Sequence, residues 1–147
     1  MMDLIRILIA DDHTLFRDGL RALLNSLPVL EVVGEAATGQ EVIEQAERLQ
    51  PDVILMDLNM PKLNGVEATR AIHNEYPDIC IIGLSMFEES ERAQALRDAG
   101  AVSYLTKSGP PENLVSTIRR CMGGAGDAAV EQKPRAQHGV KRPRKKN

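Results

Sequence analysis

The sequence contains few aromatic residues and no long hydrophobic run. Phe, Tyr and Trp together make up 3% of the 147 residues, and Trp is absent. The core must therefore be aliphatic, and stacking of bases on exposed rings is not expected. No apolar stretch approaches the roughly 20 residues that cross a bilayer, and the N-terminus lacks a basic segment followed by a hydrophobic run and a cleavage site. We expect a cytoplasmic protein without a membrane partner.

Cysteine is scarce as well. Cys80 and Cys121 are too few and too far apart in the sequence for a zinc site, and Cys80 lies in the apolar run 79–82. Isolated cysteines in such surroundings behave as small hydrophobic residues. We expect two reduced thiols, with Cys80 in the core.

Charge divides the chain into two parts. Residues 1–122 contain 11 Lys/Arg and 19 Asp/Glu, a net charge of −8, whereas residues 123–147 contain 7 and 2, a net charge of +5. The second part starts with a glycine-rich segment and continues with Pro, Lys and Arg without apolar periodicity, so burial cannot offset the entropy of ordering it. We predict one domain over 1–122 and a flexible, disordered basic tail over 123–147.

Short apolar runs alternate with segments of helical period along residues 1–122. We predict strands near 4–10, 30–36, 52–57, 79–84 and 102–106, a first helix marked by an apolar stripe from Phe16 to Leu27, and helices near 39–49, 64–75, 88–99 and 111–122. This alternation is typical of β-α units around a parallel sheet. Residues 53–56 are apolar without alternation, so this strand belongs in the middle, with helices on both faces. The predicted fold class is α/β with a five-stranded parallel sheet.

Charged and polar side chains stand where the predicted strands end. Asp11 and Asp12 follow the first strand, Asp57 ends the third, Ser85 follows the fourth and Lys107 follows the fifth. Ligands of an open parallel sheet bind outside the carboxyl ends of its strands, so these side chains are expected to meet. Adjacent carboxylates repel each other, and a hard cation such as Mg²⁺ binds carboxylate and carbonyl oxygens. The combination predicts a site for a divalent cation and a phosphoryl group.

Each of these side chains also has an ordinary interpretation. Asp11 and Asp12 are suitable for capping the next helix, Asp57 precedes a turn, and Ser85 or Lys107 at a strand end is usually a turn cap or a solvated charge. A carboxylate at the end of a central strand beside a cation is, however, a competent nucleophile on phosphorus, and a nearby ammonium neutralises a phosphate oxygen. The joint placement at four strand ends favours the second interpretation.

These motifs resemble the receiver domain of two-component response regulators. They occur in the right order over residues 1–122 and comprise Asp11-Asp12, Asp57-Leu58-Asn59-Met60-Pro61 with Gly65, Ser85 and Lys107. Further segments are similar to the subfamily that usually carries a LuxR-type helix-turn-helix: Asp11-Asp12-His13, Phe16-Arg17-Asp18-Gly19-Leu20, and Lys107-Ser108 followed by Arg119-Arg120. The resemblance implies a flavodoxin-like (βα)5 fold with strand order 2-1-3-4-5.

The resemblance also implies how the site acts. Asp57 would accept a phosphoryl group from the phosphohistidine of a sensor histidine kinase. Mg²⁺ or Mn²⁺ would be held by Asp11, Asp12, Asp57 and the backbone carbonyl of Asn59. The protein would be a switch that takes part in its own phosphorylation and dephosphorylation, not an enzyme that turns over a separate substrate.

Two residues are implied as the switch that reports the phosphate. Ser85 and Lys107 would bind it, and Ser85 together with Tyr104 would transmit its presence, since Tyr104 resembles the aromatic residue that changes rotamer on activation. A half-buried strand residue is an equally good interpretation of Tyr104. The expected response is altered partner binding, or homodimerisation through the face of the fourth and fifth strands and helices or through another helical face.

The expected output module is not in the sequence. A helix-turn-helix module needs on the order of 60 residues, and 25 follow Met122. DNA would be a partner only through an output domain outside this sequence. A stand-alone receiver, part of a longer regulator and the receiver of a hybrid kinase all remain open.

Three other functions have less support. An aspartyl-phosphate phosphatase of the haloacid-dehalogenase-like group would have a second acidic residue two positions after Asp57, where Asn59 stands. A flavodoxin-like cofactor protein would have a glycine- and hydroxyl-rich phosphate loop in place of Asp11 and Asp12. The basic run 141–146 would allow at most unspecific, salt-sensitive binding of nucleic acid.

Overall fold

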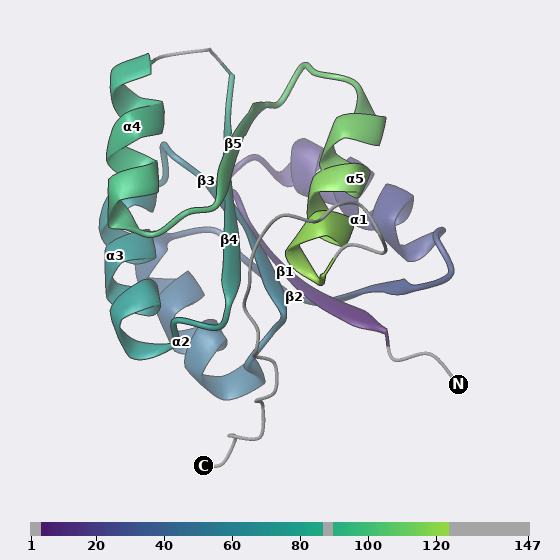
Figure 1. Ribbon diagram of the computed structural model, residues 1–147, viewed down its shortest axis with the longest axis horizontal. Helices are drawn as coiled ribbons and strands as arrows, with labels where there is room; N and C mark the ends of the chain where they lie inside the picture. The colour runs from purple at the N-terminus through teal and green to yellow at the C-terminus, as the bar shows by residue number, and fades with distance from the viewer. Residues whose placement is uncertain (1–3, 87–89, 124–147) are drawn as a thin grey trace.

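The computed structural model describes residues 4–86 and 90–123 (Figure 1). Strands and helices alternate strictly in this part of the chain. The elements are β1 (Ile5–Ala10), α1 (Thr14–Asn25), β2 (Leu30–Ala36), α2 (Gly39–Leu49), β3 (Val53–Asp57), α3 (Gly65–Glu75), β4 (Cys80–Ser85), α4 (Ser90–Ala99), β5 (Ser103–Thr106) and α5 (Pro111–Cys121).

The strands form one parallel sheet in the order β2-β1-β3-β4-β5. The predicted fold class and strand order are therefore confirmed. β3 pairs with β1 on one side and β4 on the other, and all five of its residues are buried. The register places Asp57 opposite Leu84 and Ser85 opposite Thr106, so the carboxyl ends of the central strands lie at one edge of the sheet.

Helices cover both faces of the sheet. Figure 1 shows α2, α3 and α4 on one face and α1 and α5 on the other. Alternate residues of each strand supply the two cores, because successive side chains of a strand point to opposite faces. The α2-α3-α4 face buries Leu8, Val42, Ile54, Met56, Ile72, Ile81 and Leu96. The α1-α5 face buries Ile7, Ile9, Leu24, Leu55, Ile82, Leu114 and Ile118.

The start of α3 lies directly against the end of β3. Asn64 caps this helix by accepting a hydrogen bond from the backbone of Glu67, and the Glu67 side chain accepts one from the Asn64 backbone in return. Gly65 allows the close approach, because a Cβ there would overlap the carbonyl oxygen of Asp57 and the Cα of Leu58. The capping residue and the glycine thus fix the path of the chain after Asp57.

The expectation of two reduced thiols is wrong for this structure. Cys80 and Cys121 form a disulfide, with their Cα atoms 6.2 Å apart and a sequence separation of 41. Cys80 begins β4 on the same sheet face as Ile82, and Cys121 lies one helical turn after Ile118 on the side of α5 that packs there. Cys80 is half-buried, not fully enclosed. The two residues meet because α5 packs back along β4, a contact that the sequence separation conceals.

The predicted boundaries agree with the structure to within about two residues where the two can be compared. The apolar stripe of α1 extends past the helix: α1 ends at Asn25, and Leu27 packs on the core from the following turn. The predicted tail from residue 124 onward, and the predicted helix start at 88, lie outside the described residues. No described helix has the length and hydrophobicity needed to cross a membrane.

Candidate functional site

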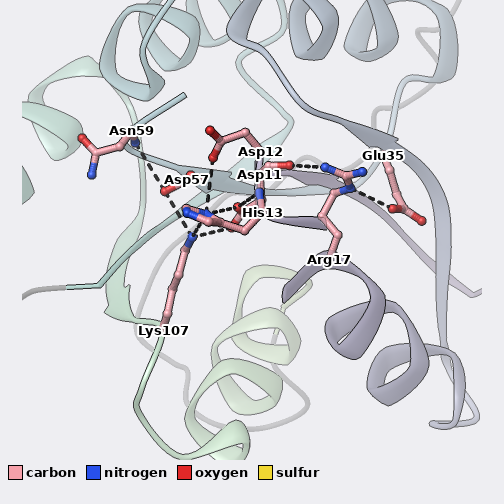
Figure 2. Close-up of polar contacts among 8 residues, drawn as sticks. All are labelled: Asp11, Asp12, His13, Arg17, Glu35, Asp57, Asn59 and Lys107. Carbon is pink, nitrogen blue, oxygen red and sulfur yellow. Dashed lines mark hydrogen bonds and ion pairs between the residues drawn. The ribbon is translucent and has the colours of Figure 1, made fainter. Parts of the chain in front are cut away.

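The predicted site residues from β1, β3 and β5 meet at the carboxyl edge of the sheet (Figure 2). Asp11 is 1% exposed and Asp57 is 2% exposed. Asp12 keeps 33% of its side chain exposed. Lys107 is enclosed, with 3% of its side chain exposed. The strand ends therefore bring three carboxylates and one ammonium into a single cluster that is open to solvent mainly at Asp12.

Lys107 places its ammonium among the carboxylates. Its Nζ lies 2.6 Å from Oδ2 of Asp11 and 3.5 Å from Oδ1 of Asp57. The same atom lies 4.8 Å from the ring centroid of Phe16, within the range of a cation-π contact. The backbone N–H of Lys107 donates to the carbonyl of Ser85 at 2.7 Å. This extension of the β4-β5 ladder aims the side chain at the acidic pair.

His13 is a member of the cluster that the sequence analysis did not assign to it. Its Nδ1 lies 3.0 Å from Oδ1 of Asp11, 3.3 Å from Oδ1 of Asp12 and 3.3 Å from Nζ of Lys107. Asp11, Asp12, His13 and Asp57 each offer a ligand atom, and these atoms lie within 4.8 Å of one another. His13, and not an aspartate, is the N-cap of α1, and the first turn of that helix contains no acidic residue. Helix capping therefore does not explain the acidic pair.

Asp57 is buried and only partly compensated. Its Oδ1 accepts a hydrogen bond from the backbone N–H of Asn59 at 3.3 Å. Its Oδ2 is buried and has no hydrogen-bond partner among the described residues. Burial raises the pKa of the Asp57 carboxyl above its usual value, the charge of Asp11 raises it further, and Lys107 opposes the shift. A buried carboxylate oxygen without a partner, beside two more carboxylates, suits a hard cation or an electrophilic phosphorus.

A second feature missed by the sequence analysis is the ion-pair network behind Asp11. Nη1 of Arg17 donates to the backbone carbonyl of Asp11 at 2.6 Å, and its Nε donates to Glu35 at 3.0 Å. Arg21 also donates to Glu35, at 2.6 Å. The network joins α1 and β2 to the residue that begins the site. The only signal in the sequence was the position of Arg17 one helical turn after His13, within a segment noted for its subfamily similarity.

The remaining predicted residues lie around the cluster. Ser85 ends β4 and is 2% exposed at the same edge of the sheet. Tyr104 is half-buried on β5 and packs against the core of the α2-α3-α4 face, away from the acidic cluster. Asn59 is exposed, and Figure 2 shows its side chain pointing away from Asp57 while its backbone nitrogen faces that residue. The structure thus gathers the charged residues and leaves Tyr104 at the neighbouring face.

A groove of about 840 Å³ adjoins the site along β5 and is lined from α1, α4 and α5. Phe16, Leu20, Lys107, Pro110 and Leu114 are among its lining residues, and so is Leu15, whose side chain is 86% exposed. An exposed leucine beside a buried lysine gives this rim of the site an apolar contact surface.

A buried aspartate stands at the end of the central strand of a (βα)5 sheet, beside an acidic pair and a lysine. Residues 7–119 match the response regulator receiver domain family. The chain belongs to that family of two-component signalling proteins.

Relatives and solved structures agree with this assignment. The chain is 40% identical over 121 residues to the response regulator GacA of Pseudomonas viridiflava, covering 82% of this chain and 56% of that protein. It is 42% identical over 121 residues to the transcriptional regulatory protein LiaR of Bacillus subtilis, covering 82% and 57%. A LuxR-family two-component response regulator from Aurantimonas sp. SI85-9A1 superposes with a TM-score of 0.77 at 35% identity, covering 83% of this chain and 88% of that one. The chain thus spans little more than half the length of these curated relatives.

Proposed function

We propose that this chain is the phosphoacceptor switch of a two-component pathway and that Asp57 accepts the phosphoryl group from the phosphohistidine of a sensor histidine kinase. The observation that carries the proposal is the buried Oδ2 of Asp57. This oxygen lacks a hydrogen-bond partner among the described residues, yet it stands at the end of the central strand beside a lysine and an acidic pair. Leaving a buried acceptor unpaired costs about 1–3 kcal/mol, a cost that is understandable at a site built for a ligand.

The positions of Asp57 and Lys107 support the proposed transfer. A carboxylate oxygen of Asp57 attacks phosphorus, an O–P bond forms, and the N–P bond of the phosphohistidine breaks with its electron pair returning to the imidazole. The product is an acyl phosphate on Asp57. Lys107, whose ammonium lies 3.5 Å from the attacking carboxylate, moves its charge from Asp11 to a phosphoryl oxygen.

The oxygen-rich cluster fits a hard divalent cation, Mg²⁺ or Mn²⁺. Asp11, Asp12, Asp57 and the backbone carbonyl of Asn59 would hold it, because these are the ligand types that such cations prefer. A bound cation supplies positive charge that offsets the repulsion between the carboxylates and the phosphoryl oxygens. Lys107 alone provides one positive charge against three carboxylates.

The switch is proposed to run through Ser85 and Tyr104. Ser85 would bind a phosphoryl oxygen at the end of β4, and Tyr104 would repack against the α4 side of the sheet. The outcome would be altered partner binding or homodimerisation, through the face of β4, α4, β5 and α5 or another helical face, with no turnover of a separate substrate.

The wider setting is part of the same proposal. The receiver domain would occupy residues 1–122 and act in the cytoplasm, with residues 123–147 as a basic tail that phosphorylation does not need. DNA would be contacted only by an output domain outside this sequence.

The test is phosphorylation by a small phosphodonor. We expect incubation with acetyl phosphate and Mg²⁺ to add the mass of one phosphoryl group to the wild-type protein and none to Asp57→Asn. Asp78→Asn, which changes an exposed carboxylate before β4, is the matched control and should be labelled normally. Labelling of Asp57→Asn at the wild-type level would refute the assignment of Asp57. Wild-type labelling that persists in excess chelator would refute the role of the cation.

A further inference from the structure

A hydrogen bond beside the site joins the first turn of α4 to the loop after β3. Nη2 of Arg92 donates a hydrogen bond to Oδ1 of Asn59 at 2.6 Å, across 33 residues of sequence. A guanidinium donor at this distance makes a charge-assisted hydrogen bond. The pair is exposed, so its contribution to the stability of the fold is small. Its significance lies in the other groups that Asn59 contacts.

Asn59 connects this contact to the phosphoacceptor. Its backbone N–H donates to Oδ1 of Asp57 at 3.3 Å, and its carbonyl is a proposed cation ligand. The side chain held by Arg92 and the backbone that faces Asp57 leave the same Cα. Any displacement of that Cα that brings the carbonyl to a cation also displaces the side-chain amide. Arg92 would sense such a displacement through its hydrogen bond to Oδ1.

The chain on either side of Asn59 is fixed. Leu58 is fully buried and donates its N–H to the carbonyl of Leu84 at 3.1 Å, and its own carbonyl accepts from the N–H of Gly65 at 3.0 Å. Met60 is 6% exposed. Asn59 is thus an exposed residue between two buried ones, and Arg92 restrains the part of the loop that its neighbours leave adjustable.

The helix at the other end of the contact has a small buried face. The buried hydrophobic residues of α4 are Ala93, Leu96 and Ala99. Leu96 fits against Gly83 of β4, where a Cβ would overlap its Cδ2 atom. Two alanines and one leucine bury little apolar area, so α4 is held less firmly than a helix with several large buried side chains. A single hydrogen bond at its first turn can shift its position measurably.

We propose that Arg92 is a positioning residue that couples α4 to the phosphoryl-transfer site through Asn59, so that cation binding displaces the first turn of α4. The proposal rests on the proposed function, because it takes the Asn59 carbonyl as a cation ligand. Coupling between two sites is reciprocal. Loss of Arg92 should therefore change the cation affinity, by about 1.5- to 5-fold for an exposed contact of this kind.

Amide NMR of the full chain tests the coupling without relying on phosphorylation. We would titrate Mg²⁺ into the ¹⁵N-labelled wild type, Arg92→Ala and Arg97→Ala. Arg97 is the matched control, an exposed arginine in the last turn of the same helix. In the wild type and in Arg97→Ala, the amides of residues 57–59 and 91–93 should shift together with one dissociation constant. In Arg92→Ala the shifts of 57–59 should persist with a changed constant, and those of 91–93 should be lost.

Asn59→Ala removes the same hydrogen bond from the other side and keeps the backbone carbonyl. It should reproduce the loss at 91–93, and the double variant should add nothing further, as expected for two partners of one contact. Shifts at 91–93 that persist at full size in Arg92→Ala would overturn the coupling, and so would an equal loss in Arg97→Ala. A wild type without Mg²⁺-dependent shifts at 57–59 would instead remove the cation site, and with it the metal role in the proposed function.

Discussion

The two ends of β3 each have an aspartate, and the two are treated in opposite ways. Asp52, just before the strand, accepts a hydrogen bond from the backbone N–H of Arg6 at 2.9 Å, and the Arg6 guanidinium donates to the carbonyl of Gln50 at 2.8 Å. Asp57, at the other end, is buried beside Asp11 with one oxygen that lacks a hydrogen-bond partner among the described residues. The carboxylate of Asp52 stabilises the fold through a hydrogen bond. The carboxylate of Asp57 is buried with an oxygen that is unpaired within the part of the chain that the structure describes, which is unfavourable until a ligand binds. Residue type and strand position alone do not separate structure from function here, whereas the hydrogen-bond partners do.

The largest expected effect on stability comes from the disulfide at the edge of the sheet where the strands begin. Cys80 and Cys121 close a loop with a sequence separation of 41. Chain-entropy estimates for a loop of this length give about 4 kcal/mol. We expect the double variant Cys80→Ser/Cys121→Ser to lose up to that amount of unfolding free energy in urea, and reduced wild type to lose a similar amount. The rate of phosphorylation by acetyl phosphate should stay near the wild-type value, because the disulfide is at the edge opposite to the site. A loss of phosphorylation in a variant that remains folded would contradict this separation of the two edges.

The next largest effect should be on cation affinity, through the hydrogen bond from Arg17 to the backbone carbonyl of Asp11. Arg17→Gln removes the guanidinium that bonds the Asp11 carbonyl, and residues that orient ligands in this way typically contribute 10- to 100-fold to metal affinity. We expect a loss of about that size in Mn²⁺ affinity, measured by electron paramagnetic resonance. Arg21→Gln is the control, since Arg21 also bonds Glu35 but pairs with Asp18 on its own helix. Equal losses in both variants would assign the effect to Glu35 and the charge of α1 instead.

A smaller effect should appear at Asp52. Asp52→Ala leaves the part-buried N–H of Arg6 without its acceptor, at a cost of about 1–2 kcal/mol. Urea unfolding at neutral pH measures the loss. Asp52→Asn, which retains an acceptor oxygen, should lose less than Asp52→Ala. If the two variants lost the same amount, the hydrogen bond would not be what Asp52 contributes.

Asp57→Asn should stabilise the fold, whereas Asp52→Ala should destabilise it. The pKa of Asp57 is raised in the folded protein, so ionising this group costs folding free energy. That cost is absent below the unfolded pKa, near 4, and is complete above the folded pKa. We therefore expect Asp57→Asn, with chelator present, to unfold at a higher temperature than wild type at pH 7, and the difference to vanish as the pH falls toward 4. A variant less stable than wild type at pH 7 would show that Asp57 is compensated as well as Asp52.

The smallest expected effect is that of deleting residues 124–147. The proposed site groups all precede Met122, and the tail has no apolar periodicity with which to pack. Its net charge of +5 against −8 for residues 1–122 allows only an electrostatic contact, which physiological salt screens beyond roughly 8 Å. Phosphorylation rate and thermal midpoint should be unchanged at physiological salt. A large loss of either would place the domain boundary further along the chain.

The fold and the charged cluster were predictable because they depend on local patterns. Unbroken apolar runs identified the strands, and polar residues just past them had to meet once the sheet was parallel. Asp11, Asp12, Asp57 and Lys107 were found in this way.

The disulfide and the side-chain contacts around the site were not predicted, because they depend on how the helices pack and on which way individual side chains point. Whether Cys121 faces β4 is decided by how α5 packs, and its partner lies at a sequence separation of 41. The contacts of Arg17 with a backbone carbonyl and of Arg92 with an amide follow no residue-pair pattern that a sequence displays. His13 was noted only as part of a motif of the subfamily. In the structure it caps α1 without a side-chain hydrogen bond, and its ring faces the carboxylates.

The order in which the strands occur has a consequence for the synthesis of the protein. Asp11 comes from the first strand and Asp57 from the third, but Lys107 follows the last strand of the sheet. Contacts this distant in sequence form late, because the chain between them must be ordered first. A nascent chain that has emerged only as far as β4 has its acidic cluster without the ammonium that balances it. The proposed site is therefore completed with the last β-α unit, and a chain competent for the proposed phosphorylation would be one whose sheet is already complete.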